Sequence, residues 1–258
     1  MKITLITVCY NSEKTIKDTL ESVLMQTYEN YEYLIIDGKS KDETVSILKE
    51  YEKKFKGKMK FVSEKDKGLY DAMNKGIDMS TGDIVGILNS DDVLIDKDVF
   101  KKIVDNYKED TDVLYADLIY VDETLKTPIR DYISGYKSGD YWCPAHPTMY
   151  IRKKVFDEIG KYNLEYKTCA DYDFMVRLNI NNYKFTYLRD YLVLMRMGGV
   201  SNGIKGYYNN FKDAYSILKD NKVKFPLLKT FRRIIHIMFQ YVNALGKQGK
   251  IKEIINNK

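Results

Sequence analysis

The sequence has few cysteines, and they form no recognisable set. Cys9, Cys143 and Cys169 are an odd number of residues scattered along 258 positions, whereas disulfide frameworks and cysteine zinc sites need paired, regularly spaced cysteines. The N-terminus also lacks a charged region followed by a long apolar core and a cleavage site, so no secretory signal peptide is visible. These absences predict a protein of the reducing cytoplasm.

Two common nucleotide-binding motifs are missing. Gly38-Lys39-Ser40 resembles the end of a phosphate-binding loop, but Tyr33 stands where that loop needs its first glycine, and Asp37 would repel phosphate. No G-x-G-x-x-G follows the first predicted strand, so dinucleotide binding has no support. Internal repeats and low-complexity tracts are absent as well.

The composition is that of a soluble globular protein. Hydrophobic residues make up 44% and charged residues 31%, which is enough for one sizeable core and one main domain. The 42 Lys and Arg residues exceed the 37 Asp and Glu residues by five. This excess is compatible with anionic substrates or an anionic membrane surface, but it is too small to predict a nucleic-acid partner.

Strand-like and helix-like patterns alternate through the first half of the chain. This alternation predicts an α/β fold with a mostly parallel central sheet flanked by helices. Ser40 followed by Glu43 predicts a capping box at the start of one of the helices. The expected strands are residues 3–9, 33–36, 60–63, 84–88, 113–117 and 192–197.

Two adjacent carboxylates, Asp91 and Asp92, follow the apolar strand at residues 84–88. Acids at the carboxyl end of a buried strand lie where open α/β sheets bind their ligands. Two ionised neighbours repel each other, and a hard divalent cation shared with a substrate's phosphates relieves that repulsion. The pair therefore predicts a metal-dependent site for a phosphorylated substrate.

Four segments match a known pattern in both order and spacing. Together they resemble the inverting glycosyltransferases of family 2, which have the GT-A fold, over about residues 1–200. The resemblance implies transfer of a sugar from a nucleotide-sugar donor, a UDP-sugar, to a glycan or lipid-linked acceptor in surface-polysaccharide biosynthesis. The segments are Thr7-Val8-Cys9-Tyr10-Asn11, Ile36 to Thr44, Asp66 to Gly76, and Asn89-Ser90-Asp91-Asp92.

The resemblance also implies roles on the donor side. Val8, Tyr10 and Asp37 are expected to contact the donor, and a tyrosine ring beside a carboxylate suits a nucleotide base. Asp66 and Asp71 belong to the segment expected to close over the nucleotide, and Asp91 should face the ribose or the sugar. Asp92 is the expected ligand of Mn²⁺ or Mg²⁺. Asn89 takes the place of the first acid of a strict D-x-D motif.

The catalytic base predicted for inverting transfer is Asp171. Such a reaction needs one group to take the proton of the attacking acceptor hydroxyl, and Asp171 fills the position of the aspartate in the family's E-D pair, with Ala170 in place of the glutamate. Without the resemblance, Asp171 and Asp173 would simply suit a helix N-terminus, where the helix dipole favours acids.

Two further residues are candidates for contacts to the acceptor or to phosphate. His146 lies between two prolines in an aromatic loop, which in this family borders the acceptor and the metal. Ser201 follows a glycine pair after the last predicted strand, in a loop that would suit either a lid with backbone N–H groups for phosphate or a plain turn. A structural histidine remains the alternative for His146.

The chain divides into a catalytic domain at residues 1–205 and a helical extension at residues 206–258. From Leu227 to Leu245, basic and polar residues recur on one helical face and apolar residues occupy the rest. This amphipathic helix suits peripheral contact with the inner face of the cell membrane. It would equally suit packing on the catalytic domain or on a second copy of the chain in a homodimer.

Two alternatives to a glycosyltransferase remain open at this point. A sugar-phosphate nucleotidyltransferase also combines a metal with carboxylates, but such enzymes carry a glycine-rich, arginine-containing loop where this chain has Cys9-Tyr10-Asn11. A non-catalytic basic module that binds membrane or nucleic acid would leave the acids around Asp91 and Asp171 unexplained.

Overall fold

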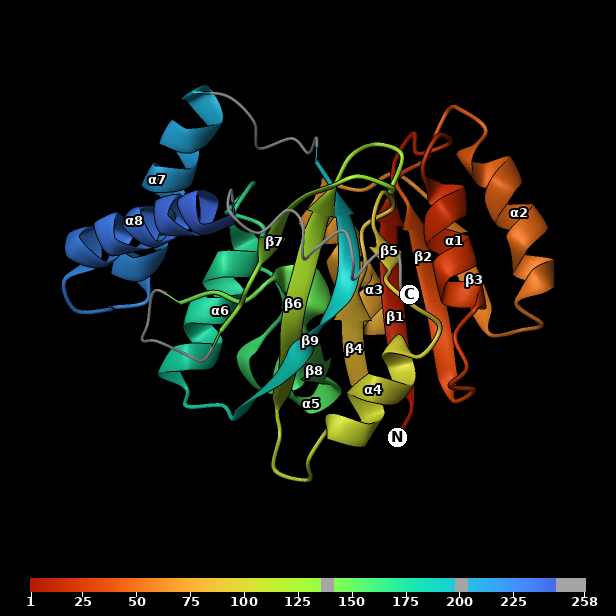
Figure 1. Ribbon diagram of the computed structural model, residues 1–258, viewed down its shortest axis with the longest axis horizontal. Coiled ribbons are helices and arrows are strands. Elements are labelled where there is room, and N and C mark those ends of the chain that lie inside the picture. Colours follow the sequence, from red (N-terminus) through yellow and green to blue (C-terminus); the bar gives the residue numbers. More distant parts are fainter. Residues whose placement is uncertain (136–141, 198–203, 245–258) are drawn as a thin grey trace.

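The computed structural model describes residues 1–135, 142–197 and 204–244. Its described strands form one sheet in the order β3-β2-β1-β4-β8-β6-β9-β5, with β7 paired to β6 (Figure 1). The strands are β1 Ile3–Cys9, β2 Tyr31–Asp37, β3 Met59–Ser63, β4 Ile84–Ile87, β5 Val93–Leu94, β6 Val113–Val121, β7 Pro128–Tyr132, β8 Tyr150–Arg152 and β9 Phe185–Arg196.

The helices connect these strands and cover both faces of the sheet. They are α1 Ile16–Leu24, α2 Thr44–Lys54, α3 Leu69–Met79, α4 Val99–Asn106, α5 Lys153–Ile159, α6 Ala170–Ile180, α7 Ile204–Asp220 and α8 Pro226–Ala244, with a short 3-10 helix at His146–Thr148. The α/β architecture with a central sheet between helices confirms the predicted fold class.

The first half of the sheet is parallel, as the sequence predicts. β1 pairs in parallel with both β2 and β4, and β2 pairs in parallel with β3. Every residue of β1 and β4 is buried, because helices cover both faces of these strands. The four predicted strands in this region match β1 to β4 to within about two residues at each end, the usual uncertainty of strand boundaries.

Beyond β4 the sheet becomes mixed. β8 runs antiparallel to both β4 and β6, whereas β6 and β9 are parallel to each other. The sequence prediction missed β5, β7 and β8, which are two, five and three residues long, because such short strands carry too few residues for an alternating pattern to emerge.

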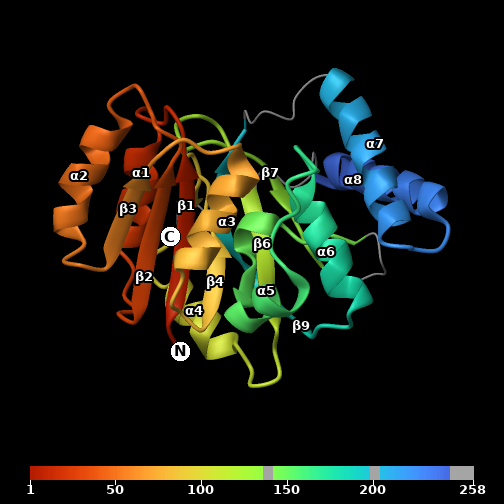
Figure 2. The ribbon, with the colours of Figure 1, turned by 180° about the vertical axis from the view of Figure 1, so that it is seen from behind.

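Two hydrophobic cores lie on opposite faces of the sheet. One core packs α1, α2 and α4 against it through residues such as Leu20, Leu48 and Phe100, and these helices cover the face seen in Figure 1. The other packs α3, α5 and α6 through residues such as Met73 and Phe174, which cover the face seen from behind in Figure 2. The parallel half of the sheet is therefore covered by helices on both faces.

The start of α2 differs from the sequence prediction. The capping box between Ser40 and Glu43 is wrong, because α2 begins at Thr44 and its N-cap residue, Glu43, makes no capping hydrogen bond through its side chain. The Ser40 hydroxyl donates to Asp37 instead, and the backbone N–H of Thr44 donates to the Asp42 carboxylate at 3.1 Å. A carboxylate on the preceding turn has replaced the expected cap.

The helical extension lies against the second core. α7 packs on α6 through a small cluster that includes Tyr172, Val176, Ala214 and Leu218, and α8 packs beside α7 at one side of the molecule (Figure 1). In the described part of the chain, no helix has both the length and the apolar character needed to cross a bilayer.

Gly86 in β4 leaves room for an aromatic side chain of the neighbouring strand β8. A Cβ atom at this position would lie 2.5 Å from the ring of Tyr150, its register partner in β8, and the Tyr150 side chain is fully enclosed. Since neither strand has room to move within the sheet, only glycine fits here. This contact lies just before the acid pair and fixes the position of β4.

We expect Gly86→Ala to lower the free energy of unfolding by about 1–3 kcal/mol, the usual cost of overpacking a core. Urea denaturation would measure the loss. In a Tyr150→Leu background, which removes the ring atoms nearest the new methyl group, the same substitution should cost less. An equal loss in both backgrounds would contradict this explanation.

Candidate active site

The carboxyl ends of β1, β2 and β4 open onto a single pocket of about 960 Å³, at the upper end of the range for small-molecule sites. Parallel strands end at the same edge of a sheet, so loops that are distant in sequence meet there. Several of its lining residues belong to the four segments that resemble family 2 glycosyltransferases: Val8, Tyr10, Asp66, Leu69, Ser90 and Asp91.

Tyr10 and Asp66 meet over Gly38. A Cβ atom at Gly38 would lie 2.7 Å from Asp66 Oδ2 and 3.4 Å from Tyr10 Cδ2, so the missing side chain lets both residues close over the turn after β2. The Tyr10 ring is 58% exposed, which leaves its surface available for stacking against a planar ligand. This corner of the pocket therefore offers an aromatic face with a carboxylate beside it.

Asp37 lies beneath that corner and is fully buried. Its carboxylate accepts hydrogen bonds from the backbone N–H of Ser40 at 3.0 Å and from the hydroxyls of Ser40 and Ser63. The Cys9 thiol donates to it at 3.6 Å, and burial together with the charge of Asp37 raises the pKa of that thiol. Asp37 thus holds the turn after β2, and its expected contact with the donor base stays a prediction.

Asp66 and Asp71 order the segment before α3. Asp66 Oδ1 accepts a hydrogen bond from the backbone N–H of Gly68, and Asp71 Oδ2 accepts one from the backbone N–H of Lys67, each at 2.9 Å. The two carboxylates therefore shape one short turn at the mouth of the pocket. Asp66 faces the pocket, and Asp71 supports the turn from within the first turn of α3.

The acid pair follows β4, with its two carboxylates in different surroundings. Asp91 lines the pocket, and burial raises the pKa of its carboxyl. Asp92 is fully buried, and burial together with the neighbouring Asp91 raises the pKa of its carboxyl well above the ordinary value. Asp92 Oδ2 accepts a hydrogen bond from the Asn89 amide at 2.8 Å.

The second oxygen of Asp92 makes the pair suited to a cation. Asp92 Oδ1 is buried without a hydrogen-bond partner among the described residues, and a buried, unpartnered carboxylate oxygen is costly unless a positive charge compensates it. The described residues hold no cluster of three or more acidic, histidine or cysteine ligands. A divalent cation here would thus draw its other oxygen ligands from phosphate and water, as Mg²⁺ commonly does.

Arg196, which the sequence analysis missed, holds the acid loop from β9. Its guanidinium donates to the backbone carbonyl of Asp91 at 2.6 Å and to that of Glu123 at 3.0 Å, and it pairs with the Asp18 carboxylate. Arg196 is only 8% exposed, so these contacts are largely shielded from water. A single arginine in a predicted strand gave no sign of this role.

Asp171 is joined to the pocket wall by Tyr70. Leu69 and Ala72 of α3 line the pocket, while Tyr70, on the same helical turn, donates its hydroxyl to Asp171 Oδ1 at 3.0 Å. Burial and the charge of Asp171 raise the pKa of the Tyr70 phenol, so that hydroxyl stays protonated. The first turn of α6 is therefore attached directly to the helix that borders the pocket.

His146 belongs to the same cluster. Its Nε2 atom lies 2.8 Å from the Tyr162 hydroxyl, and the Tyr162 ring packs against Tyr70 with a centroid separation of 5.6 Å. Burial lowers the pKa of the imidazole, although the charge of Asp171 opposes that shift, so His146 is neutral at neutral pH. Asp171 and His146 thus lie on one polar cluster, whereas Ser201 lies outside the described residues.

The sequence model of glycosyl transferase family 2 matches residues 4–177. The chain belongs to this family. A PGL/p-HBAD biosynthesis glycosyltransferase of Mycobacterium bovis is 30% identical over 189 residues, which are 72% of this chain and 73% of the relative. Family membership favours glycosyltransferase activity over the nucleotidyltransferase and the non-catalytic module.

Solved structures share the GT-A fold of this family 2 glycosyltransferase. S. aureus TarS 1-349 in complex with UDP matches with a TM-score of 0.64 at 21% identity, and the match covers 84% of this chain but only 64% of that one. The mannosyltransferase PcManGT of Pyrobaculum calidifontis, in complex with GDP-Man and Mn²⁺, matches with a TM-score of 0.60 at 12% identity and covers 91% of this chain and 74% of that one.

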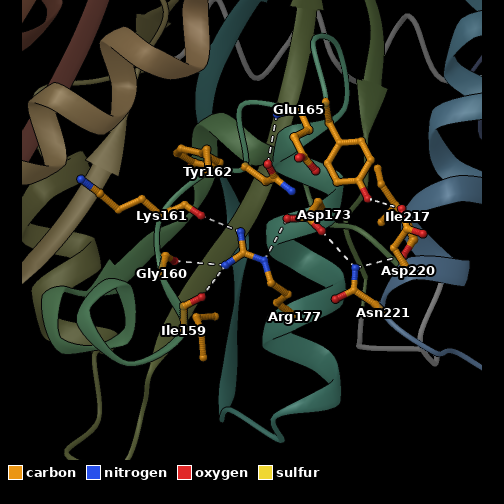
Figure 3. A network of polar contacts seen from close by, with 12 residues as sticks. Ile159, Gly160, Lys161, Tyr162, Glu165, Asp173, Arg177, Ile217, Asp220 and Asn221 are labelled. Carbon is orange, nitrogen blue, oxygen red and sulfur yellow. Dashed lines mark hydrogen bonds and ion pairs between the residues drawn. The ribbon is translucent and has the colours of Figure 1, made fainter.

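A polar network centred on Arg177 holds α6 in place (Figure 3). The Arg177 guanidinium donates to the backbone carbonyls of Ile159, Gly160 and Lys161 at 2.6–3.1 Å and pairs with Asp173 at 2.8 Å. Asp173 also accepts a hydrogen bond from Asn221, which follows α7. The network therefore ties α6 both to the loop that carries Tyr162 and to the helical extension.

We expect Arg177→Met to lower the free energy of unfolding by about 3 kcal/mol, because it leaves a buried carboxylate without its cation. The Asp173 side chain is only 4% exposed. Chemical denaturation would measure the loss. Lys184→Met, which breaks an ion pair with Asp110 whose side chains are 66% and 64% exposed, should leave the midpoint unchanged. Similar losses in the two variants would contradict the assigned role of Arg177.

Proposed function

We propose that this chain is an inverting glycosyltransferase that transfers a sugar from a UDP-sugar by a single displacement. The observation that carries the proposal is that α3 borders the pocket and also contacts the proposed base. Tyr10, Asp66 and Asp91 line the pocket together with residues of α3. Asp171 is bonded to α3 through Tyr70. A donor in the pocket would thus lie against the helix to which the proposed base is bonded.

The donor's nucleotide would occupy the corner formed by Tyr10 and Asp66. The exposed Tyr10 ring supports stacking on a base, and the Asp66 carboxylate can accept hydrogen bonds from base N–H groups or sugar hydroxyls. UDP is supported as the nucleotide because TarS was solved with UDP and with UDP-GlcNAc. PcManGT was solved with GDP-Man, so GDP is the alternative to be tested.

Asp91 and Asp92 would hold a divalent cation, Mn²⁺ or Mg²⁺. When bound, that cation would stabilise the negative charge on the departing diphosphate. The unpartnered Asp92 Oδ1 supports this assignment, as does the Mn²⁺ in the PcManGT complex. Asn89 and Arg196 would keep the acid loop in place, through the Asp92 side chain and the Asp91 carbonyl respectively.

Asp171 would act as the base on the acceptor side. Tyr70 occupies Oδ1, and among the described residues no hydrogen bond engages Oδ2, so this oxygen can take the proton of an acceptor hydroxyl as that hydroxyl attacks the anomeric carbon. His146, neutral and paired with Tyr162, would help to position the acceptor. A role for Ser201 in phosphate binding stays a prediction.

The acceptor is proposed to be a glycan or a lipid-linked glycan of a surface polysaccharide. The name of the Mycobacterium bovis relative points to glycosylation in a biosynthetic pathway. A cytoplasmic location is supported by three free cysteines, which a reducing compartment preserves. The division into a catalytic domain at residues 1–205 and an extension at residues 206–258 stays a prediction.

A thermal-shift panel would test the donor and the cation together. We expect UDP with Mn²⁺ to raise the melting temperature by roughly 5–10 °C near saturation, and GDP, dTDP and CMP to have smaller effects. EDTA or Asp92→Asn should remove most of the UDP effect, because EDTA removes the cation and Asp92→Asn removes one of its proposed ligands. Asp83→Asn, at the opposite end of β4, is the control. A response to UDP that survives both treatments would overturn the cation assignment.

Transfer assays with Asp171→Asn would test the base. We expect kcat to fall about 100- to 10,000-fold, the usual contribution of general base catalysis, while the UDP-induced thermal shift is retained. Glu165→Gln, an exposed acid in the loop before α6, should behave like the wild type. Unchanged turnover in Asp171→Asn would reject its role as the base.

A further inference from the structure

The excess of positive over negative charge in this chain comes from its helical extension. Between Lys222 and Lys252 lie eight of the 42 Lys and Arg residues and none of the 37 Asp and Glu residues. The remainder of the chain therefore carries a net negative formal charge, although the whole chain has a charge of +5. By sequence, this segment therefore differs in charge from the rest of the chain, and a basic segment favours anionic partners.

α8 buries one of its faces against the rest of the molecule. Thr230 is 1% exposed, and the Arg233 guanidinium lies 4.4 Å from the centre of the Tyr172 ring in α6. With about 100° of rotation per residue, positions 230, 233 and 234 share this inner face. From its sequence position, Arg233 belongs to the predicted basic and polar face of this helix. In the structure it turns inward instead, where a cation over an aromatic ring stabilises the contact.

The outer face of α8 is apolar. Leu227, Leu228, Phe231 and Ile235 are each 50–51% exposed and fall within one sector of the helix, and Phe225, just before the helix, is 72% exposed. Five of the fourteen large apolar side chains that are exposed in the described residues thus lie between positions 225 and 235. A gathered apolar face of this kind marks an interaction surface, unlike the single residues found elsewhere.

Basic residues border this apolar face. Arg232 is exposed on the adjoining sector of α8, and Lys224 is exposed just before the helix. Phe231 is steadied by an edge-on contact with Phe211 of α7, at a centroid separation of 5.5 Å, so the apolar face is held in place rather than folded inward. A partner that binds this surface must therefore be apolar where it meets the apolar face and negatively charged where it meets the basic residues.

We propose that the outer face of α8, formed by Phe225, Leu227, Leu228, Phe231 and Ile235, docks on an anionic lipid bilayer with the helix lying in the plane of the interface. An anionic bilayer has apolar chains beneath negative headgroups, which matches both parts of this surface. A second copy of the chain would instead bring two basic margins together, and like charges across an interface disfavour association.

Docking in this orientation would bring the proposed base close to the bilayer. The inner face of α8 contacts Tyr172, the residue after Asp171, and a helix with its side chains is about 10 Å across. A hydroxyl on a saccharide attached to a lipid headgroup would thus be within reach of the site. This link to the acceptor rests on the proposed function, whereas the lipid contact itself rests only on the surface of α8.

Vesicle sedimentation of the full chain would test the proposal. One sample would contain vesicles of phosphatidylcholine alone, and the other vesicles of phosphatidylcholine with about 30% phosphatidylglycerol, at the same total lipid concentration. We expect binding to the anionic vesicles that weakens as salt rises, because screening reduces the charge term. Lys224→Gln with Arg232→Gln should weaken binding about 10- to 30-fold. Phe231→Ser with Ile235→Ser should weaken it at least tenfold at every salt concentration.

The control is Met25→Ser, which removes an apolar side chain that is 59% exposed at the end of α1 and should not alter vesicle binding. Size-exclusion chromatography with light scattering gives the mass of each variant. Equal binding to the two kinds of vesicle, or unchanged binding by the α8 variants, would overturn the proposal. So would an apolar variant that only converts a dimer into a monomer, because a second copy would then be the occupant.

The two proposals fail in different measurements. If vesicle binding is absent but UDP with Mn²⁺ still stabilises the protein, only the lipid surface is wrong. If vesicle binding occurs but UDP has no effect, only the proposed function is wrong. Melting temperatures and circular dichroism of the α8 variants show that a loss of binding does not come from unfolding.

Discussion

Burial of β1, β2 and β4 on both faces is the constraint from which the site follows. With helices on either side, these strands carry no exposed residue, and their acids lie near their ends. Glu32 pairs with Lys2 at the amino end of β2, whereas Asp37 ends β2, and Asp91 and Asp92 follow β4. The same geometry that forms the core thus gathers the acids of two distant segments at one edge.

The N-terminal half of the fold could be predicted because its signals are local. An apolar run ending in a polar turn identifies a buried strand and its end, so β1 to β4 and the position of Asp91 follow from the order of residues alone. The short strands β5 and β8 could not be predicted, because their pairing depends on partners far away in sequence. β7 pairs with the neighbouring strand β6, but its five residues show no alternation of apolar and polar side chains. The GT-A expectation came from matched motifs rather than from hydrophobic periodicity.

The site residues that escaped prediction are mainly those whose partners are backbone atoms. Arg177 and Arg196 each bind carbonyl groups that only the folded chain brings within reach. Ser40 was expected to cap a helix, but an acid three residues earlier is a closer acceptor for its hydroxyl. Tyr70 lay inside a recognised motif, yet its bond to Asp171 spans 101 positions and no local pattern could reveal it.

The contacts of Arg196 have a consequence for the energetics of the proposed nucleotide binding. Its guanidinium joins the acid loop, the segment at Glu123 and α1 through contacts that need no ligand. The acid loop is thereby pre-organised. Ordering this side of the pocket would therefore reduce the free energy of nucleotide binding only slightly.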